Sequence, residues 1–91
     1  MKARVWDRVR LLVDVPGEMS ERDVIPVGTL GVVVEAYETP VEGYAVDTAI
    51  PIHEEPYGYE YDNVILYPDQ FIVVMRYVED ESLAELAAAK G

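Results

Sequence analysis

Few residues in this chain have the chemistry of a nucleophile, a base or a metal ligand. The sequence holds one histidine, His53, and no cysteine. Its two serines, Ser20 and Ser82, stand in a polar loop and in a helix-capping pattern, neither of which is the setting of an activated nucleophile. His53 precedes Glu54 and Glu55, but one imidazole and two adjacent carboxylates are too few ligands for a metal site. We therefore expect no catalytic residues, no metal and no cofactor, and interpret His53 as an exposed loop residue.

A cluster of tyrosines and carboxylates follows this histidine. Tyr57, Tyr59 and Tyr61 recur at every second position, which in a strand places them on one face. Tyrosine offers a large contact area at low entropic cost and is enriched in interfaces. The predicted partner-binding residues are Glu54, Glu55, Tyr57, Tyr59, Glu60 and Asp62. Tyrosines that line the core of a small barrel, with their hydroxyl groups at the rim, are the alternative interpretation, and the sequence leaves both open.

The charge distribution narrows the class of partner. The chain has 18 acidic and 7 basic residues, a formal net charge of −11. No lysine or arginine occurs between Asp23 and Met75. Binding to a phosphate backbone depends on cationic side chains that displace counterions, so this region disfavours nucleic acid. We expect a basic protein partner, attracted over long range. An acidic surface that serves only solubility is the alternative.

Length and hydropathy bound the class of protein. A chain of 91 residues suffices for one domain with a single modest core. It has no apolar run long enough to span a membrane, and residues 1–4 lead into an alternating strand rather than a signal-peptide core. We therefore expect a cytoplasmic, bacterial-type protein without membrane contacts.

The organising stretch is residues 27–37, Val-Gly-Thr-Leu-Gly-Val-Val-Val-Glu-Ala-Tyr. Gly28 and Gly31 predict a sharp turn of the backbone, and the β-branched run after them predicts a buried strand. Before this stretch, residues 4–15 alternate with period two and predict a first strand. Its exposed side would carry Trp6 beside arginines, a pattern that fits nucleic-acid binding or, more simply, pairing with acids of neighbouring strands.

Three more strands are predicted after this stretch. They cover residues 44–50, 59–66 and 72–78, with a long connection over residues 51–58 and a short 3₁₀ turn within residues 66–71. Five short strands with glycine at the corners suggest a small SH3-like barrel, because closing a sheet removes its exposed edges. The predicted fold class is therefore mainly β.

The end of the sequence changes character. Residues 82–85, Ser-Leu-Ala-Glu, form a capping-box pattern, and Leu83, Leu86 and Ala87 form a narrow apolar stripe. We predict a barrel over residues 1–78 and a short C-terminal helix over residues 79–91. A helix this short is marginal alone, so it should pack on the barrel or on a partner.

Three motifs follow one another along the predicted strands: Gly28-x-x-Gly31-x-Val33-Val34-Glu35-x-Tyr37, Gly43-Tyr44-x-Val46 and Leu66-Tyr67-Pro68-Asp69-Gln70-Phe71. Together they resemble a family of small bacterial SH3-like domains of unknown function, over about residues 9–74. The glycine strand is also similar to the KOW element of ribosomal and transcription-elongation barrels. The chain departs from the family at Thr48, where an aromatic residue is usual, and at Tyr67, where leucine directly precedes the proline.

The resemblance implies no catalytic residues, and some members of that family occur near toxin or immunity genes. We therefore predict a non-enzymatic acidic binding protein, an immunity protein or antitoxin that binds and occludes a basic toxin or enzyme. The alternative is an accessory or structural subunit of a protein complex that uses the barrel and the C-terminal helix for assembly. The sequence leaves the oligomeric state open.

Overall fold

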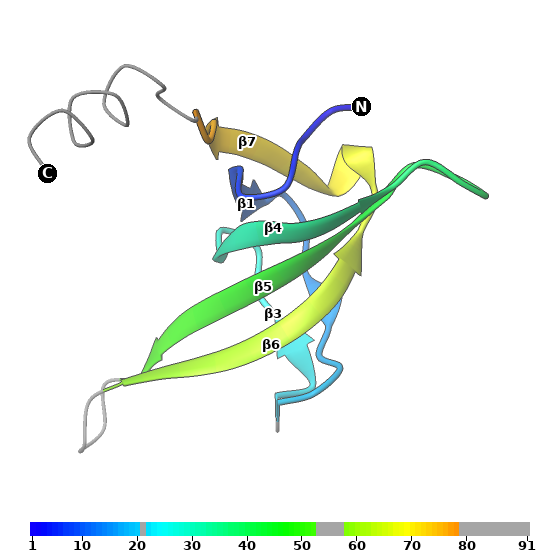
Figure 1. Ribbon diagram of the computed structural model, residues 1–91. Coiled ribbons are helices and arrows are strands. Elements are labelled where there is room, and N and C mark those ends of the chain that lie inside the picture. The colour runs from blue at the N-terminus through cyan, green and yellow to red at the C-terminus, as the bar shows by residue number, and fades with distance from the viewer. Residues whose placement is uncertain (21, 53–57, 79–91) are drawn as a thin grey trace, which may run out of the picture.

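The computed structural model describes residues 1–20, 22–52 and 58–78, and the fold is mainly β (Figure 1). Five strands form one antiparallel sheet in the order β6-β5-β4-β1-β7, and two short strands, β2 and β3, pair separately. The elements are β1 (Arg8–Leu11), β2 (Val15–Pro16), β3 (Val24–Ile25), β4 (Leu30–Tyr37), β5 (Gly43–Ile52), β6 (Gly58–Leu66), the 3₁₀ turn η1 (Pro68–Gln70) and β7 (Phe71–Met75). No helix among the described residues is long and apolar enough to cross a membrane.

The core lies on the sheet face that β2 and β3 cover. Alternation along β5 buries Tyr44, Val46 and Thr48 and leaves Asp47 exposed. The Tyr44 ring meets the Phe71 ring edge-on, with centroids 5.3 Å apart. The other large buried aliphatic residues of this core are Val9, Leu11, Val15, Ile25, Val33, Val64 and Leu66.

The two glycines of the organising stretch act in different ways. Gly28 has φ +89°, a conformation that favours glycine, and its amide donates to the Leu11 carbonyl at 2.8 Å. Gly31 lies in β4, where an added Cβ would meet Val46 Cγ1 at 2.5 Å and the Asp47 carbonyl oxygen at 2.9 Å. Gly28 therefore makes the turn into β4, whereas Gly31 permits close approach of β5.

The first strand is shorter than the sequence predicts. Trp6 has φ +77°, and its amide donates to the Val33 carbonyl at 2.7 Å, so the chain turns before β1 begins at Arg8. The turn is held by the buried carboxylate of Asp7, which accepts hydrogen bonds from the amides of Arg4 at 2.9 Å and Tyr77 at 2.8 Å. Alternation in sequence could not reveal this turn, because no glycine, proline or asparagine marks it.

Other boundaries also differ from those predicted. β5 extends to Ile52 and β6 begins at Gly58, so the long connection predicted over residues 51–58 is shorter than expected. Pro51 lies within β5, opposite Tyr59. The predicted 3₁₀ turn is present as η1, and the strand after it ends at Met75 rather than at residue 78.

The predicted mainly β class is confirmed, but the pairing of the described strands does not show the predicted closed barrel. The five-stranded sheet has β6 at one edge and β7 at the other. The predicted C-terminal helix, residues 79–91, lies outside the described residues.

Candidate functional site

The site is built on the sheet face that points away from β2 and β3, which we call the outer face. The register of the five-stranded sheet aligns one residue from each of its strands in a single row across this face. The row reads Ile72, Arg10, Leu30, Ala49 and Tyr61, from β7 to β6. All but Ala49 are exposed, so this face carries uncovered apolar and aromatic side chains.

Tyr59 and Tyr61 lie together on this face at the β6 edge. Their rings are tilted against each other with centroids 6.0 Å apart, and the two residues are 55% and 66% exposed. Strand alternation explains their position. The even-numbered residues Asp62, Val64 and Leu66 of β6 point inward, so the odd-numbered Tyr59 and Tyr61 point outward. The interpretation that these tyrosines line the core is therefore wrong for Tyr59 and Tyr61.

A shallow apolar hollow adjoins this pair. Its volume is about 560 Å³, and it is lined by residues 27–30 of the turn into β4, residues 49–51 of β5 and Tyr59. Val27 and Leu30 are exposed there. A tyrosine ring beside such a hollow can hold an apolar or aliphatic side chain of a partner. The sequence did not predict Leu30 and Ala49 as site residues. Only the pairing register, which aligns Leu30 of β4 with Ala49 of β5 and Ala49 with Tyr61 of β6, places them beside the tyrosines.

Glu60, the acid between the two tyrosines, is already paired. Its Oε2 lies 3.1 Å from Nε of Arg22, and both side chains are partly exposed. An exposed pair of this kind adds little to stability. It does reduce the negative charge that Glu60 offers to a partner.

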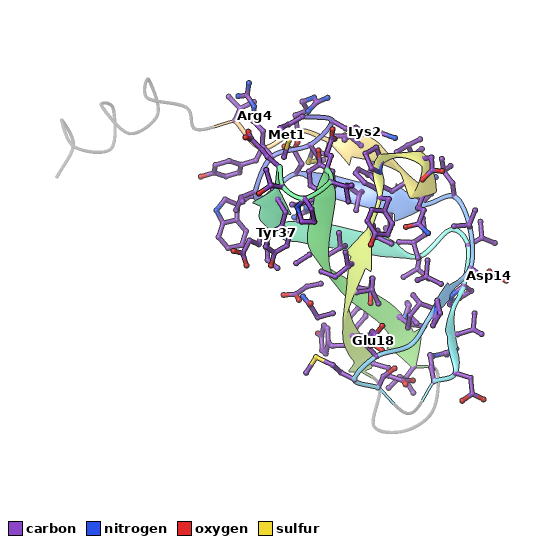
Figure 2. All side chains as sticks on the ribbon, turned by 90° about the vertical axis from the view of Figure 1, so that its right-hand side faces the viewer. Met1, Lys2, Arg4, Asp14, Glu18 and Tyr37 are labelled. Atoms are coloured by element: carbon purple, nitrogen blue, oxygen red, sulfur yellow. The ribbon has the colours of Figure 1, made fainter. Side chains whose placement is uncertain are left out.

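Asp62 does not belong to the exposed surface. It is 5% exposed, and its carboxylate accepts hydrogen bonds from the amides of Glu18, Met19 and Ser20 at 2.9–3.1 Å and from the Ser20 hydroxyl at 2.8 Å. These contacts place the Asp62 carboxylate near Glu18, at the opposite end of the molecule from Met1 and Arg4 (Figure 2). The prediction of Asp62 as a partner-binding residue is corrected on this ground, because the loop before β3 occupies its carboxylate.

These hydrogen bonds also set the ionisation of Asp62. Burial alone would raise the pKa of its carboxyl group, but the bonds from Ser20, Met19 and Glu18 outweigh burial and lower the pKa to about 2. The carboxylate is therefore charged at neutral pH, and its role is to anchor the loop to β6.

The remaining predicted site residues, Glu54, Glu55 and Tyr57, lie outside the described residues, as does His53. They belong to the connection between the ends of β5 and β6, next in sequence to Tyr59. Within residues 1–20, 22–52 and 58–78, no group of three or more histidine, cysteine or carboxylate side chains is placed to hold a metal ion.

We compared the chain with protein-family models, with curated proteins and with solved structures, and none of these comparisons gives a match.

Proposed function

We propose that this protein is a non-enzymatic binding module, SH3-like in fold, that binds a basic protein through the β6 edge of its outer face. The observation that carries the proposal is the exposed, mutually packed pair Tyr59 and Tyr61. Five strands with a 3₁₀ turn before the last one agree with the SH3-like part of the proposal. An immunity protein or antitoxin that occludes a toxin or enzyme would use such a surface.

The charges around the pair favour a cationic partner. Glu54 and Glu55 precede the tyrosines in sequence, and no lysine or arginine occurs between Asp23 and Met75. Arg22 lies nearer the pair, but its guanidinium is matched by the Glu60 carboxylate. The arginine of the outer-face row, Arg10, is three strands away from Tyr61, which is about 14 Å at the usual strand spacing. Charges that far apart are largely screened at physiological ionic strength, where the Debye length is about 8 Å.

The test is capture of binding proteins from a lysate of the source organism, with elution by a salt gradient. The wild-type chain should retain a basic protein that the Tyr59→Ser/Tyr61→Ser variant does not retain. Tyr37→Ser, which removes an exposed tyrosine at the far end of β4, is the matched control and should retain it. Retention of the same proteins by the double variant and the wild type would contradict the proposal.

Charge reversal tests the electrostatic part on the captured partner. Lysine in place of Glu54, Glu55 and Glu60 should slow association and raise the dissociation constant. Unchanged association kinetics in low salt would remove the electrostatic argument and leave only the tyrosine contact.

The second candidate function, an accessory or structural subunit, is favoured by a different observation. Trp6 is 54% exposed beside β7, where Met75 is exposed as well. Apolar surface of this kind is common in assembly interfaces. Deletion of residues 82–91 distinguishes the two functions, because it should abolish assembly of a subunit but leave binding at Tyr59 and Tyr61 intact.

A further inference from the structure

The outer face is hollowed around Trp6. A hollow of about 520 Å³ is lined by Trp6, Arg8, Val32 and residues 75–78. A second hollow of about 330 Å³ shares three of these residues and continues over Leu30 and Val74 to Ala49. We call the two together the Trp6 groove. It crosses from β7 over β1 and β4 to β5 and is apolar along its length, with arginines on β1 and after β7.

Trp6 is displayed in this groove at an energetic cost. Its φ of +77° is unfavourable for a residue with a large side chain, on the order of 1 kcal/mol. Two hydrogen bonds nevertheless fix the turn. The Trp6 amide donates to the Val33 carbonyl, and the Arg4 amide donates to the Asp7 carboxylate. A strained backbone that holds an indole ring at the surface points to a contact made by that ring.

The charge of the groove contrasts with the rest of the chain. Arg8, Arg10 and Arg76 line it, while the protein as a whole carries a formal net charge of −11. Arg76 already pairs with the buried Asp7 carboxylate at 3.2 Å, so the positive charge of the groove comes mainly from Arg8 and Arg10 on β1. One carboxylate, that of Asp47, borders its β5 end and accepts a hydrogen bond from Asn63 at 2.6 Å. A segment that fits the groove is therefore apolar on the side that faces it. It carries acidic residues near the arginines of β1 and none near Asp47 of β5.

Residues 79–91 have this chemistry. Four acids fall at residues 79, 80, 81 and 85, and the apolar stripe consists of Leu83, Leu86 and Ala87. A helix of ten residues is about 15 Å long, which matches three strand spacings of about 4.8 Å, the width of the sheet from β7 to β5. A helix of this length is marginal in isolation and needs a surface.

The segment also begins at the groove, because Val78 is one of the residues that line it. A short tether gives an effective concentration of about 1 mM, so a contact between segment and groove whose dissociation constant is well below about 1 mM is largely formed within one molecule. We infer that residues 79–91 dock in the Trp6 groove of their own chain as an amphipathic helix. In this arrangement the apolar stripe of the segment would cover Val32 and Met75, and its acids would face the arginines of the groove. This inference does not depend on the proposed function, because the tyrosine pair lies beyond the groove, on β6, although Leu30 and Ala49 line both the groove and the hollow beside Tyr59.

The sole tryptophan of the chain makes the contact measurable. In the wild-type chain of 91 residues, Trp6 fluorescence should be shifted to shorter wavelength and shielded from acrylamide. The variant Leu83→Ser/Leu86→Ser should emit at longer wavelength and be quenched about twofold more strongly, because a weak tethered contact is lost. Added peptide of residues 79–91 should restore shielding to this variant. An unchanged melting temperature of the sheet would show that the fold is intact.

Ala84→Ser/Ala88→Ser is the matched control. Serine lowers helix propensity more where it replaces alanine than where it replaces leucine, yet this variant keeps the apolar stripe, so it should keep Trp6 shielded. Equal quenching of wild type and Leu83→Ser/Leu86→Ser would overturn the inference. Shielding that appears only at concentrations where light scattering detects a dimer would also overturn it, in favour of docking onto a second copy.

Discussion

At the scale of single residues, two buried carboxylates perform tasks that their sequence neighbours do not suggest. Asp62 anchors the loop of residues 18–20, and Asp7 joins the turn before β1 to the residues after β7. Both are nearly inaccessible, at 5% and 1% exposure. Buried carboxylates persist only where donors surround them, and here the donors are mostly backbone amides.

Asp62→Asn should destabilise the fold in a pH-dependent way. The pKa of Asp62 lies at about 2, below its ordinary value of 3.8. The carboxylate therefore contributes stability that is fully present above about pH 5 and is lost as the pH falls toward 2, and the difference in pKa corresponds to about 2 kcal/mol. Urea unfolding should place the variant about 2 kcal/mol below wild type at pH 7 and much closer to it at pH 2.5.

Asp23→Asn is the control for this prediction, because Asp23 is exposed and belongs to the same loop region. Its free energy of unfolding should match that of the wild type at both pH values. A constant gap between Asp62→Asn and wild type at pH 7 and pH 2.5 would contradict the assigned role of the Asp62 charge.

Gly31→Ala should destabilise the sheet through overpacking. The added methyl group would lie 2.5 Å from Val46 Cγ1 and 2.9 Å from the Asp47 carbonyl oxygen, and the backbone contact cannot be relieved by a rotamer change. We expect a loss of about 1–3 kcal/mol in chemical denaturation. Gly58→Ala, at the start of β6, is the control, since none of the described atoms lies within 4 Å of the added Cβ. Equal stability of both variants would argue against close β4–β5 approach at Gly31.

At the scale of elements, the sequence predicts the long strands well and the turns between them less well. Residues 43–52 and 58–66 pair in β5 and β6 close to the predicted limits, because alternation and flanking glycines are local signals. The two-residue strands β2 and β3 escaped prediction, since a ribbon this short has no period to detect.

The faces of β6 show why the candidate site was only partly predictable. Tyrosines alternate there with acids, so neither face looks like a core face in the sequence. Asp62 points inward because amides more than 40 residues earlier in the chain reach its carboxylate. That information is non-local, and once it is known, Tyr59 and Tyr61 must point outward.

The Asp7 network offers a test at the element scale, because it joins the first turn to the end of β7. Arg76 also contacts Asp7, with Nη1 3.2 Å from Oδ2, but its side chain is 60% exposed. We therefore expect the backbone donors to dominate. Asp7→Asn should cost about 1–3 kcal/mol and speed hydrogen exchange at the Tyr77 amide, whereas Arg76→Gln should cost less than about 1 kcal/mol. A larger loss in Arg76→Gln than in Asp7→Asn would reverse this ranking.

At the scale of the whole molecule, the charged residues are unevenly distributed, and acidic residues are in large excess. Arginines line the Trp6 groove on β1 and after β7, while the chain from Asp23 to Met75 contains no lysine or arginine. Only two ion pairs occur among the described side chains, and both include a partly or largely exposed arginine. Attraction between opposite charges therefore offsets little of the repulsion among acids in the folded state.

This balance predicts that salt stabilises the protein. At 10 mM salt the Debye length is about 30 Å, so the acids repel one another across the whole domain, whereas at 150 mM it is about 8 Å. The melting temperature should rise between these two concentrations of NaCl, by about 4–8 °C for each kcal/mol of repulsion relieved. Neutralising the exposed acids Asp23, Glu38 and Asp69 should reduce the rise. The scan is repeated on Leu83→Ser/Leu86→Ser, because salt should also weaken the inferred contact between residues 79–91 and the arginines. A melting temperature that falls with salt in this variant would mean that attraction, not repulsion, dominates the electrostatics of the sheet.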